Sequence, residues 1–403
     1  MKERCDIAVV GGGLNGLTTA LALAQAGFEV VVVERGDPAA MLTDAFDGRV
    51  SSIAYGSKLV LDALGAWDAM AAHGEPILEV RVSDRDAPLF LHYDHTEVGD
   101  EPLGWILENR FIRRALDKAL AATPGVRTLA QAEVAGLTRD GSGATLTLAD
   151  GSSLDCSLVV ACDGAMSPMR AAAGIGHWHH AYGQQGIVCT VRHERPHRGI
   201  AHERFLPSGP FAILPIPGNL SSLVWTEKDA IVRRVMTLPR EDILEEIAWR
   251  FGDFLGDLDL VGPVWNYPLR LVLADRYTDH RLALLGDAAH AIHPIAGQGF
   301  NLGIRDCAVL AEVLADGRRL GLDPGDATLL EGYARWRRTD TMALVAVTDS
   351  LNRLFSNAFP PVAFARDLGL AAVNAMPTLR RLFMRHAMGT VGKLPRLMRG
   401  ESL

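Results

Sequence analysis

A glycine-rich turn between an apolar strand and a helix constrains this chain most. The run Ile7-Ala8-Val9-Val10 is short and rich in β-branched residues, which is typical of a buried parallel strand. Gly11-Gly12-Gly13-Leu14-Asn15-Gly16 follows it, and apolar residues then recur at helical spacing up to Gly27, a plausible C′ glycine. A second apolar run, Val30 to Val33, completes a strand–helix–strand unit. This pattern predicts an α/β fold with a Rossmann-like parallel sheet.

The spacing of the glycines predicts a dinucleotide site. Gly11 allows the tight turn, Gly13 lets a pyrophosphate approach the backbone, and Gly16 lets the helix pack on the strand. The helix N-terminus offers free N–H groups and a partial positive charge to the phosphates. Glu34 ends the second strand, where a carboxylate can accept a hydrogen bond from an adenosine ribose. The residues assigned to this part of the site are Gly11, Gly13, Leu14, Asn15, Gly16, Glu34 and Arg35.

Two later clusters help to decide whether the dinucleotide is FAD or NAD. Leu158-Val159-Val160 leads into Asp163-Gly164, and Ser167-Pro168 then has the pattern of an N-cap with proline at the first helical position. A third apolar run leads into Gly286-Asp287, followed by a glycine-rich segment from His293 to Asn301. FAD needs separate contacts for its pyrophosphate, its ribityl chain and its isoalloxazine ring. Three spaced clusters therefore favour FAD.

These clusters closely resemble those of the class A flavoprotein monooxygenases, which hold FAD without a second Rossmann domain. Within that class the chain looks like the ubiquinone-biosynthesis hydroxylases, and the resemblance covers nearly its whole length. It implies ring hydroxylation of a polyprenylated phenol or benzoquinol precursor through a flavin C4a-hydroperoxide, with O2 as co-substrate and NAD(P)H or a partner reductase as electron source. The stretches that carry the narrower resemblance are 47–54, 204–215, 293–306 and 394–400.

The resemblance also assigns cofactor contacts. It implies that Asp287 bonds the ribityl hydroxyls and that Arg49 and Arg110 lie near the flavin and its phosphates, the alternative being ordinary surface arginines. The Gly297-Gln298-Gly299 turn could aim a helix N-terminus at the N1–C2=O edge of the reduced flavin. The cofactor residues expected in the later clusters are Asp163, Gly164, Gly286, Asp287, Pro294, Gly297, Gln298, Gly299 and Asn301.

The middle of the chain predicts a second, substrate-side domain. Pro217-Gly218-Asn219 has the pattern of a hairpin between two apolar runs, and further runs at 187–191 and 201–206 suggest a mainly antiparallel sheet. An apolar pocket on it would exclude water. For Phe211 and Trp225, packing within the sheet is an equal alternative. The expected pocket residues are Gly209, Pro210, Phe211, Trp225, Tyr267 and Pro268.

No residue in the sequence identifies itself as the catalytic base. His290 and His293 lie beside the third cluster and are weak candidates, because a histidine in a glycine-rich turn is as often a structural partner. His177, His179 and His180 lack the cysteine or carboxylate companions of a metal site, so we expect no metal and place them in a loop or domain junction.

Composition limits the remaining functions. The net charge of −8 argues against nucleic acid as a partner, and the five cysteines include no C-x-x-C pair, as expected in a reducing compartment. We expect no signal peptide and a cytoplasmic protein. The basic and apolar tail, 378–403, could lie on the inner membrane or against a partner of a ubiquinone-biosynthesis complex, or pack on its own domain.

We expect interleaved domains and keep two functional alternatives. The alternatives are hydroxylation of a small free phenolic compound and a non-catalytic FAD-holding accessory protein of a quinone-biosynthesis complex. The expected divisions are 1–74, 104–174 and 275–348 for the FAD-binding domain, 75–103 and 175–274 for the substrate domain, and 349–403 for a C-terminal helical extension.

Overall fold

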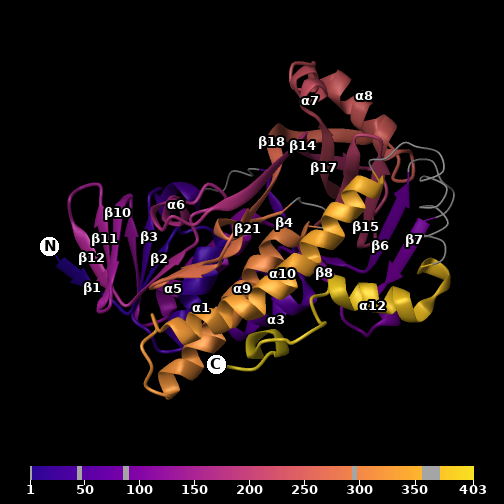
Figure 1. Ribbon diagram of the computed structural model, residues 1–403. Helices are drawn as coiled ribbons and strands as arrows, with labels where there is room; N and C mark the ends of the chain where they lie inside the picture. The colour runs from indigo at the N-terminus through magenta and orange to yellow at the C-terminus, as the bar shows by residue number, and fades with distance from the viewer. Residues whose placement is uncertain (1, 43–47, 85–89, 293–296, 356–372) are drawn as a thin grey trace.

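The computed structural model describes residues 2–42, 48–84, 90–292, 297–355 and 373–403 (Figure 1). Within them the chain forms a largely parallel sheet with helices packed against it, and a second large sheet at the other end of the molecule. The long helices α9 (Gln298–Arg319) and α10 (Ala327–Phe355) run between these two parts. The α/β fold class is thereby confirmed.

The first sheet has six strands in the order β19-β20-β13-β2-β3-β9. All neighbouring pairs are parallel except β19 with β20. Strands β2, β3, β13 and β20 are buried along their length, as the continuous apolar runs predict. The strand bounds are β2 Ile7–Val10, β3 Val30–Glu34, β9 Val126–Ala130, β13 Leu158–Ala161, β19 Thr278–Asp279 and β20 Leu282–Leu284.

Helices pack against this sheet, and the first of them lies where the sequence predicts it. Helix α1 (Leu14–Gln25) begins directly after the glycine turn and ends before Gly27, whose φ of 87° confirms the predicted C′ glycine. Helix α5 (Asn109–Ala122) packs against α1, and so does α9. The shorter helices are α2 Pro38–Met41, α3 Tyr55–Ala63, α4 Asp68–Ala71 and α6 Pro168–Ala172.

Two small sheets flank this core. A four-stranded sheet has the order β1-β12-β11-β10, and a three-stranded antiparallel sheet has the order β4-β8-β5. Strands β5 and β8 of the latter contact β16 of the second large sheet, so they connect the two halves of the molecule. The bounds are β1 Lys2–Arg4, β10 Val134–Asp140, β11 Gly143–Leu148, β12 Ser153–Cys156, β4 Val50–Ala54, β8 Gly104–Glu108 and β5 Glu75–Ile77.

The second large sheet has eight strands in the order β21-β18-β14-β17-β16-β15-β6-β7, and only β15 with β6 is a parallel pair. The predicted hairpin is confirmed, since Ile216 of β16 pairs with Leu220 of β17 across Gly218, which has a φ of 87°. The bounds are β21 His290–Ala291, β18 Leu258–Ala274, β14 His177–His193, β17 Leu220–Lys228, β16 Gly209–Ile216, β15 Ile200–Leu206, β6 Glu79–Asp84 and β7 Phe90–Asp94.

The two faces of the eight-stranded sheet have different cover. Helices α7 (Asp229–Val235) and α8 (Arg240–Phe251) close an apolar core on what we call the outer face. The inner face lies toward β5 and β8, and a smaller apolar cluster joins it to Met384 and Met388. Burial on both faces explains why the β16 sequence is apolar throughout.

The C-terminal part contributes α12 (Pro377–Ala387) and a short helix, η4 (Arg396–Arg399). The domain boundary expected at residue 348 falls inside α10. Segment η4 packs on α3 and α9, whereas α12 packs toward the inner face of the eight-stranded sheet. Among the described residues, no helix combines the length and hydrophobicity that crossing a membrane requires.

Candidate active site

The three sequence clusters come together at the carboxyl edge of the six-stranded sheet. A Cβ atom added to Gly11 would lie 2.4 Å from the carbonyl oxygen of Cys162, the residue before Asp163. A Cβ atom added to Gly286 would lie 2.6 Å from Nδ2 of Asn15. The first cluster therefore touches both of the others, and the close approaches explain why glycine stands at these positions.

The N-terminus of α1 is open. Its N-cap, Gly13, makes no side-chain cap, and a Cβ atom there would meet nothing within 4 Å. At Gly16 a Cβ atom would lie 1.9 Å from the carbonyl oxygen of Gly11, so the helix packs too tightly on the turn for any side chain. Uncapped N–H groups beside open space fit a pyrophosphate.

The Glu34 side chain accepts hydrogen bonds from two backbone N–H groups, one of them in the glycine turn. Its Oε2 accepts a 2.6 Å hydrogen bond from the Gly12 N–H, and its Oε1 accepts one of 2.6 Å from the Gly36 N–H. Its contact with a ribose stays a prediction, as does any role of the exposed Arg35. Arg113 of α5 donates a 2.8 Å hydrogen bond to the Gly12 carbonyl oxygen. Sequence reasoning missed Arg113, because it lies 101 residues from Gly12 along the chain and no local pattern links the two.

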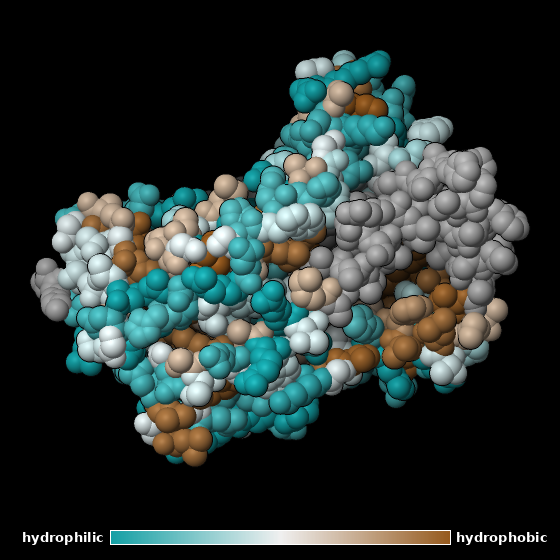
Figure 2. All heavy atoms as spheres, in the orientation of Figure 1, coloured by the Kyte–Doolittle hydropathy of each residue, from teal (hydrophilic) through white to brown (hydrophobic). Residues whose placement is uncertain are grey.

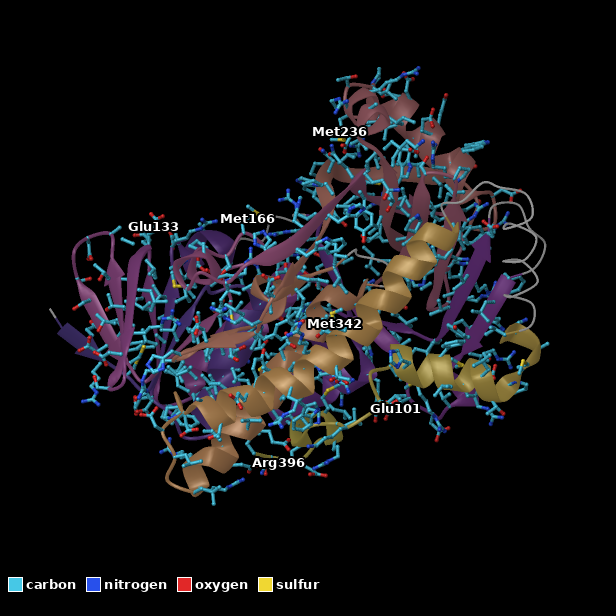
Figure 3. All side chains as sticks on the ribbon, viewed as in Figure 1. Glu101, Glu133, Met166, Met236, Met342 and Arg396 are labelled. Atoms are coloured by element: carbon cyan, nitrogen blue, oxygen red, sulfur yellow. The ribbon has the colours of Figure 1, made fainter. Side chains whose placement is uncertain are left out.

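Asp163 of the second cluster has one carboxylate oxygen that accepts no hydrogen bond from the described residues. Oδ2 of Asp163 accepts a 2.9 Å hydrogen bond from the Met169 N–H, whereas Oδ1 is buried with no partner among the described residues. Burial raises the pKa of Asp163, and hydrogen bonds from Ser167 and Met169 partly oppose the rise. Ser167 caps α6 as predicted, and Met166 beside it is 67% exposed (Figure 3).

Asp287 of the third cluster is accessible and yet surrounded by protein. Its residue surface is exposed, but enough protein surrounds the carboxyl that desolvation raises its pKa, with Asp306 adding to the rise and His290 opposing it. The two observations agree if the side chain lies on a concave surface. A carboxylate there could accept hydrogen bonds from a ligand's hydroxyl groups, as predicted for the ribityl chain.

A second open helix end lies at α9. Its N-cap, Gly297, has a φ of 61° and makes no side-chain cap, and a Cβ atom on Gly299 would meet no atom of the described residues within 4 Å. Asn301 is 7% exposed: its Oδ1 accepts from the Ala54 N–H at 2.9 Å, and its Nδ2 donates to the Ser52 carbonyl at 2.8 Å. The Asn301 side chain thus ties α9 to β4. Its expected contact with the cofactor stays a prediction.

An ionic network lies behind the third cluster. Asp306 is fully buried and accepts 2.6 Å hydrogen bonds from Nε2 of His290 and Nε of Arg337, and another of 3.0 Å from the Gly286 N–H. Burial favours the neutral acid, but His290 and Arg337 lower the pKa of Asp306 to about 2. His290 thus has a buried hydrogen-bond partner in Asp306, and a catalytic role for it stays a prediction. His293 and Pro294 fall outside the described residues.

The two predicted arginines lie near the three-stranded sheet. Arg49 is exposed just before β4, and Nε of Arg110 lies 2.6 Å from Oε2 of Glu108. The guanidinium of Arg110 also lies 4.6 Å from the Phe111 ring centroid. Their approach to a flavin stays a prediction.

Two of the expected pocket residues need correction. Phe211 and Trp225 pair across β16 and β17, and both point into the outer core under α7 and α8, where they are 0% and 1% exposed. Arg250 of α8 lies 4.0 Å from the Trp225 ring centroid. Because side chains alternate along a strand, Pro210 and Ala212 then belong to the inner face. Strand register, which the sequence alone did not supply, decides this.

Tyr267 and Pro268 lie on β18, where Tyr267 pairs with Gly186 of β14. A Cβ atom on Gly186 would lie 2.9 Å from Cζ of Tyr267, and burial raises the tyrosine pKa to about 12. The loop expected at His177 to His180 is wrong, since these residues begin β14 and pair with β18. Their expected place at a domain junction stays a prediction.

Comparison with known proteins identifies the family. Residues 4–348 match the FAD binding domain family. This chain belongs to that family of flavin-dependent monooxygenases. It is 52% identical over 402 residues to the ubiquinone hydroxylase UbiL of Rhodospirillum rubrum, covering 99% of this chain and 93% of the relative. It is 35% identical to the 3-demethoxyubiquinol 3-hydroxylase of Escherichia coli, covering 96% of this chain and 99% of that one.

The solved structures agree on the fold. The p-nitrophenol 4-monooxygenase PnpA from Pseudomonas putida DLL-E4 superposes with a TM-score of 0.81 at 20% identity, covering 97% of this chain and all of that one. FAD is the cofactor of this monooxygenase. The residues present fit it: two open helix ends, at α1 and α9, and the unpartnered oxygen of Asp163 lie around clusters that meet.

Proposed function

We propose that this monooxygenase hydroxylates the aromatic ring of a polyprenylated phenol or benzoquinol precursor of ubiquinone. The observation that carries the proposal is the 52% identity, over 99% of the chain, to a ubiquinone hydroxylase. FAD, when bound, supplies the electron transfer and oxygen activation, with NAD(P)H or a partner reductase as electron source. The protein binds the cofactor, orients the ring and excludes water.

Each task has candidate residues in the structure. The open end of α1 at Gly13 would hold the pyrophosphate, and Asp287 would hold the ribityl hydroxyls. The open end of α9 would stabilise negative charge on the reduced ring system. The inner apolar cluster, which includes Ile106 and Ile216, would keep water away and accommodate part of a prenyl chain.

The test is direct. The purified holoenzyme, given NAD(P)H or a reductase, ¹⁸O₂ and a phenol with a short prenyl chain, should yield a product that carries one ¹⁸O atom by mass spectrometry. Deleting the gene should make one prenylated precursor accumulate. A normal ubiquinone profile together with no labelled product would overturn the proposal. Turnover of a free phenol alone would favour the catabolic alternative.

We further propose that α12 rests on an anionic membrane surface. Leu382 and Phe383 are 51% and 43% exposed on this helix, next to the exposed Arg381 and Arg385. Figure 2 shows hydrophobic atoms gathered over this part of the molecule. Exposed apolar side chains between basic ones suit an interfacial helix, and a lipid surface is where a polyprenylated substrate resides.

Other arginines of the basic tail are less available for a membrane contact than the sequence indicates, because they form ion pairs within the protein. Arg380 pairs with Glu97 at 2.7 Å, and Arg396 of η4, labelled in Figure 3, pairs with Asp316 at 2.6 Å. The membrane proposal therefore concerns the exposed side of α12. A partner within a ubiquinone-biosynthesis complex stays a prediction.

A vesicle experiment tests this contact. The protein should sediment with vesicles that contain anionic lipid, and Phe383→Asp should abolish the sedimentation. Leu320→Asp is the matched control, because Leu320 is 77% exposed at the far end of α9 and should leave sedimentation unchanged. Equal sedimentation of the wild type and Phe383→Asp would exclude α12 as the contact.

A further inference from the structure

Glu203 of β15 is a carboxyl on the inner face of the eight-stranded sheet. It pairs with Ala212 of β16, and paired residues of neighbouring strands point to the same face. Two residues earlier, Ala201 belongs to the inner apolar cluster. Two residues later, Phe205 pairs with Pro210, an expected pocket residue beside the turn that joins β15 to β16. Glu203 therefore lies between the apolar cluster and that turn.

No cation on its own strand offsets this carboxylate. His202 and Arg204 point to the outer face: the His202 ring lies 4.7 Å from the Phe254 ring, and Arg204 donates a 3.1 Å hydrogen bond to the Phe251 carbonyl. Within the described part of the chain, the Glu203 side chain makes no hydrogen bond or ion pair. Its side chain is partly accessible, yet burial raises its pKa to about 7. As at Asp287, this combination indicates a concave surface.

We propose that Glu203 accepts the proton of the substrate's ring hydroxyl, an inference that rests on the proposed function and deepens it. The phenol O–H bond breaks, the proton moves to a carboxylate oxygen of Glu203, and the electron pair stays on the phenolate oxygen. The proton leaves to water as the product departs. A phenolate is more nucleophilic at its ring carbons than the phenol, which favours attack on the activated oxygen.

The groups around Glu203 are compatible with this role. Asp84 of β6 lies on the same face, since it pairs with Phe205, but burial alone accounts for the raised pKa of Glu203. Tyr93 of β7 is kept neutral there because burial raises its pKa to about 12. On β5, burial raises the pKa of Glu75, and α12 faces the cluster with methionines, while its Arg380 is bonded to Glu97. The cations placed here, His202, Arg204 and Arg380, are thus directed away from Glu203.

The first measurement is the pH profile of kcat/KM for the holoenzyme with a phenol that bears a short prenyl chain. For the wild type, kcat/KM should rise about tenfold per pH unit below about pH 7 and level off above it. Glu203→Gln should give a flat profile with kcat/KM about 100-fold lower at pH 8. Glu203→Asp keeps a carboxyl and should keep the rise. Glu246→Gln, an exposed carboxyl of α8, should match the wild type.

A second measurement separates this inference from the proposed function. Binding of the same phenol to the oxidised holoenzyme, without an electron donor, can be followed by the change in flavin absorption. Binding should tighten as pH rises through about 7, and Glu203→Gln should remove that dependence. If the wild type shows this binding but no hydroxylation, the proposed function fails while the Glu203 site stands.

Two results would overturn the inference about Glu203. A wild-type pH profile in Glu203→Gln, for turnover or for binding, would show that Glu203 does not take the proton. If Glu203→Gln does not retain FAD, the test passes to Glu203→Asp. Loss of the pH-dependent rise in that folded, flavin-bound variant would also overturn the inference.

Discussion

The six-stranded and the eight-stranded sheets build their halves of the site in different ways. On the first, backbone N–H groups, glycines and helix ends form the surface that we propose for the cofactor. On the second, side chains form the surface, and strand register decides which of them face inward. Phe211 and Ala212 are neighbours in sequence but face opposite ways. Substitutions that add atoms should therefore be most disruptive in the half built on the six-stranded sheet. In the half built on the eight-stranded sheet, the effect of a substitution should depend on which face of the sheet carries the side chain.

Gly16→Ala should have the largest effect. A Cβ atom there would lie 1.9 Å from the Gly11 carbonyl oxygen, so α1 would have to move away from the turn. We expect no retained FAD and a free energy of unfolding lowered by more than about 3 kcal/mol. Flavin absorbance per protein and urea unfolding measure the two effects.

Two further alanine variants show whether the loss of FAD comes from a blocked contact with the cofactor or from disturbed packing of α1. Gly141→Ala, in an open turn far from the site, should leave both quantities unchanged. The Cβ atom of Gly13→Ala would meet no atom within 4 Å in the described part of the chain, so this variant should fold normally but hold FAD more weakly if the pyrophosphate approaches there. Full FAD affinity in Gly13→Ala would contradict the predicted position of the pyrophosphate.

Arg337→Met should have the next largest effect. It removes a fully buried partner of Asp306 and leaves that carboxylate paired mainly through His290. We expect about 3 kcal/mol of destabilisation, because breaking a buried ion pair strands a charge. Arg319→Met, which breaks an exposed pair with Asp316, is the control and should change stability by less than about 1 kcal/mol.

The same variant has a signature in pH. In the folded protein the pKa of Asp306 is about 2, below its ordinary value of 3.8, so its stabilisation is present above about pH 4 and is lost as pH falls toward 2. Arg337→Met should raise the folded-state pKa and shift the midpoint of acid unfolding to higher pH. An unchanged midpoint would indicate that Arg337 does not stabilise the Asp306 carboxylate.

Phe211→Leu tests the two faces of the eight-stranded sheet. Phe211 is fully buried under α8, so shortening it should cost about 1 to 3 kcal/mol and leave KM for the substrate unchanged. Tyr267→Leu, on β18, should alter KM more than stability if Tyr267 borders the substrate. A changed KM in Phe211→Leu at unaltered stability would contradict the assignment of Phe211 to the outer face.

The comparison also explains how far the sequence could predict the structure. The turn at Gly11, the cap at Ser167 and the hairpin at Gly218 follow from local backbone requirements, and all three are confirmed. The faces of Phe211 and Trp225, and the reach of Arg113 to the first turn, depend on pairing between distant segments. A partly accessible carboxyl such as Glu203, with no side-chain partner among the described residues, has no local signature.

Arg380→Met should have the smallest effect and tests how α12 is held against the eight-stranded half. Arg380 donates two hydrogen bonds to Oε2 of Glu97, at 3.0 and 2.7 Å, from a half-buried position. Since such pairs are partly solvated, global stability should fall by less than about 1 kcal/mol. Amide exchange in α12 should nevertheless accelerate while exchange in α1 stays the same. Arg381→Met, next to it but exposed, should leave α12 exchange unchanged, and equal acceleration by both variants would mean that the Glu97 contact does not anchor the helix.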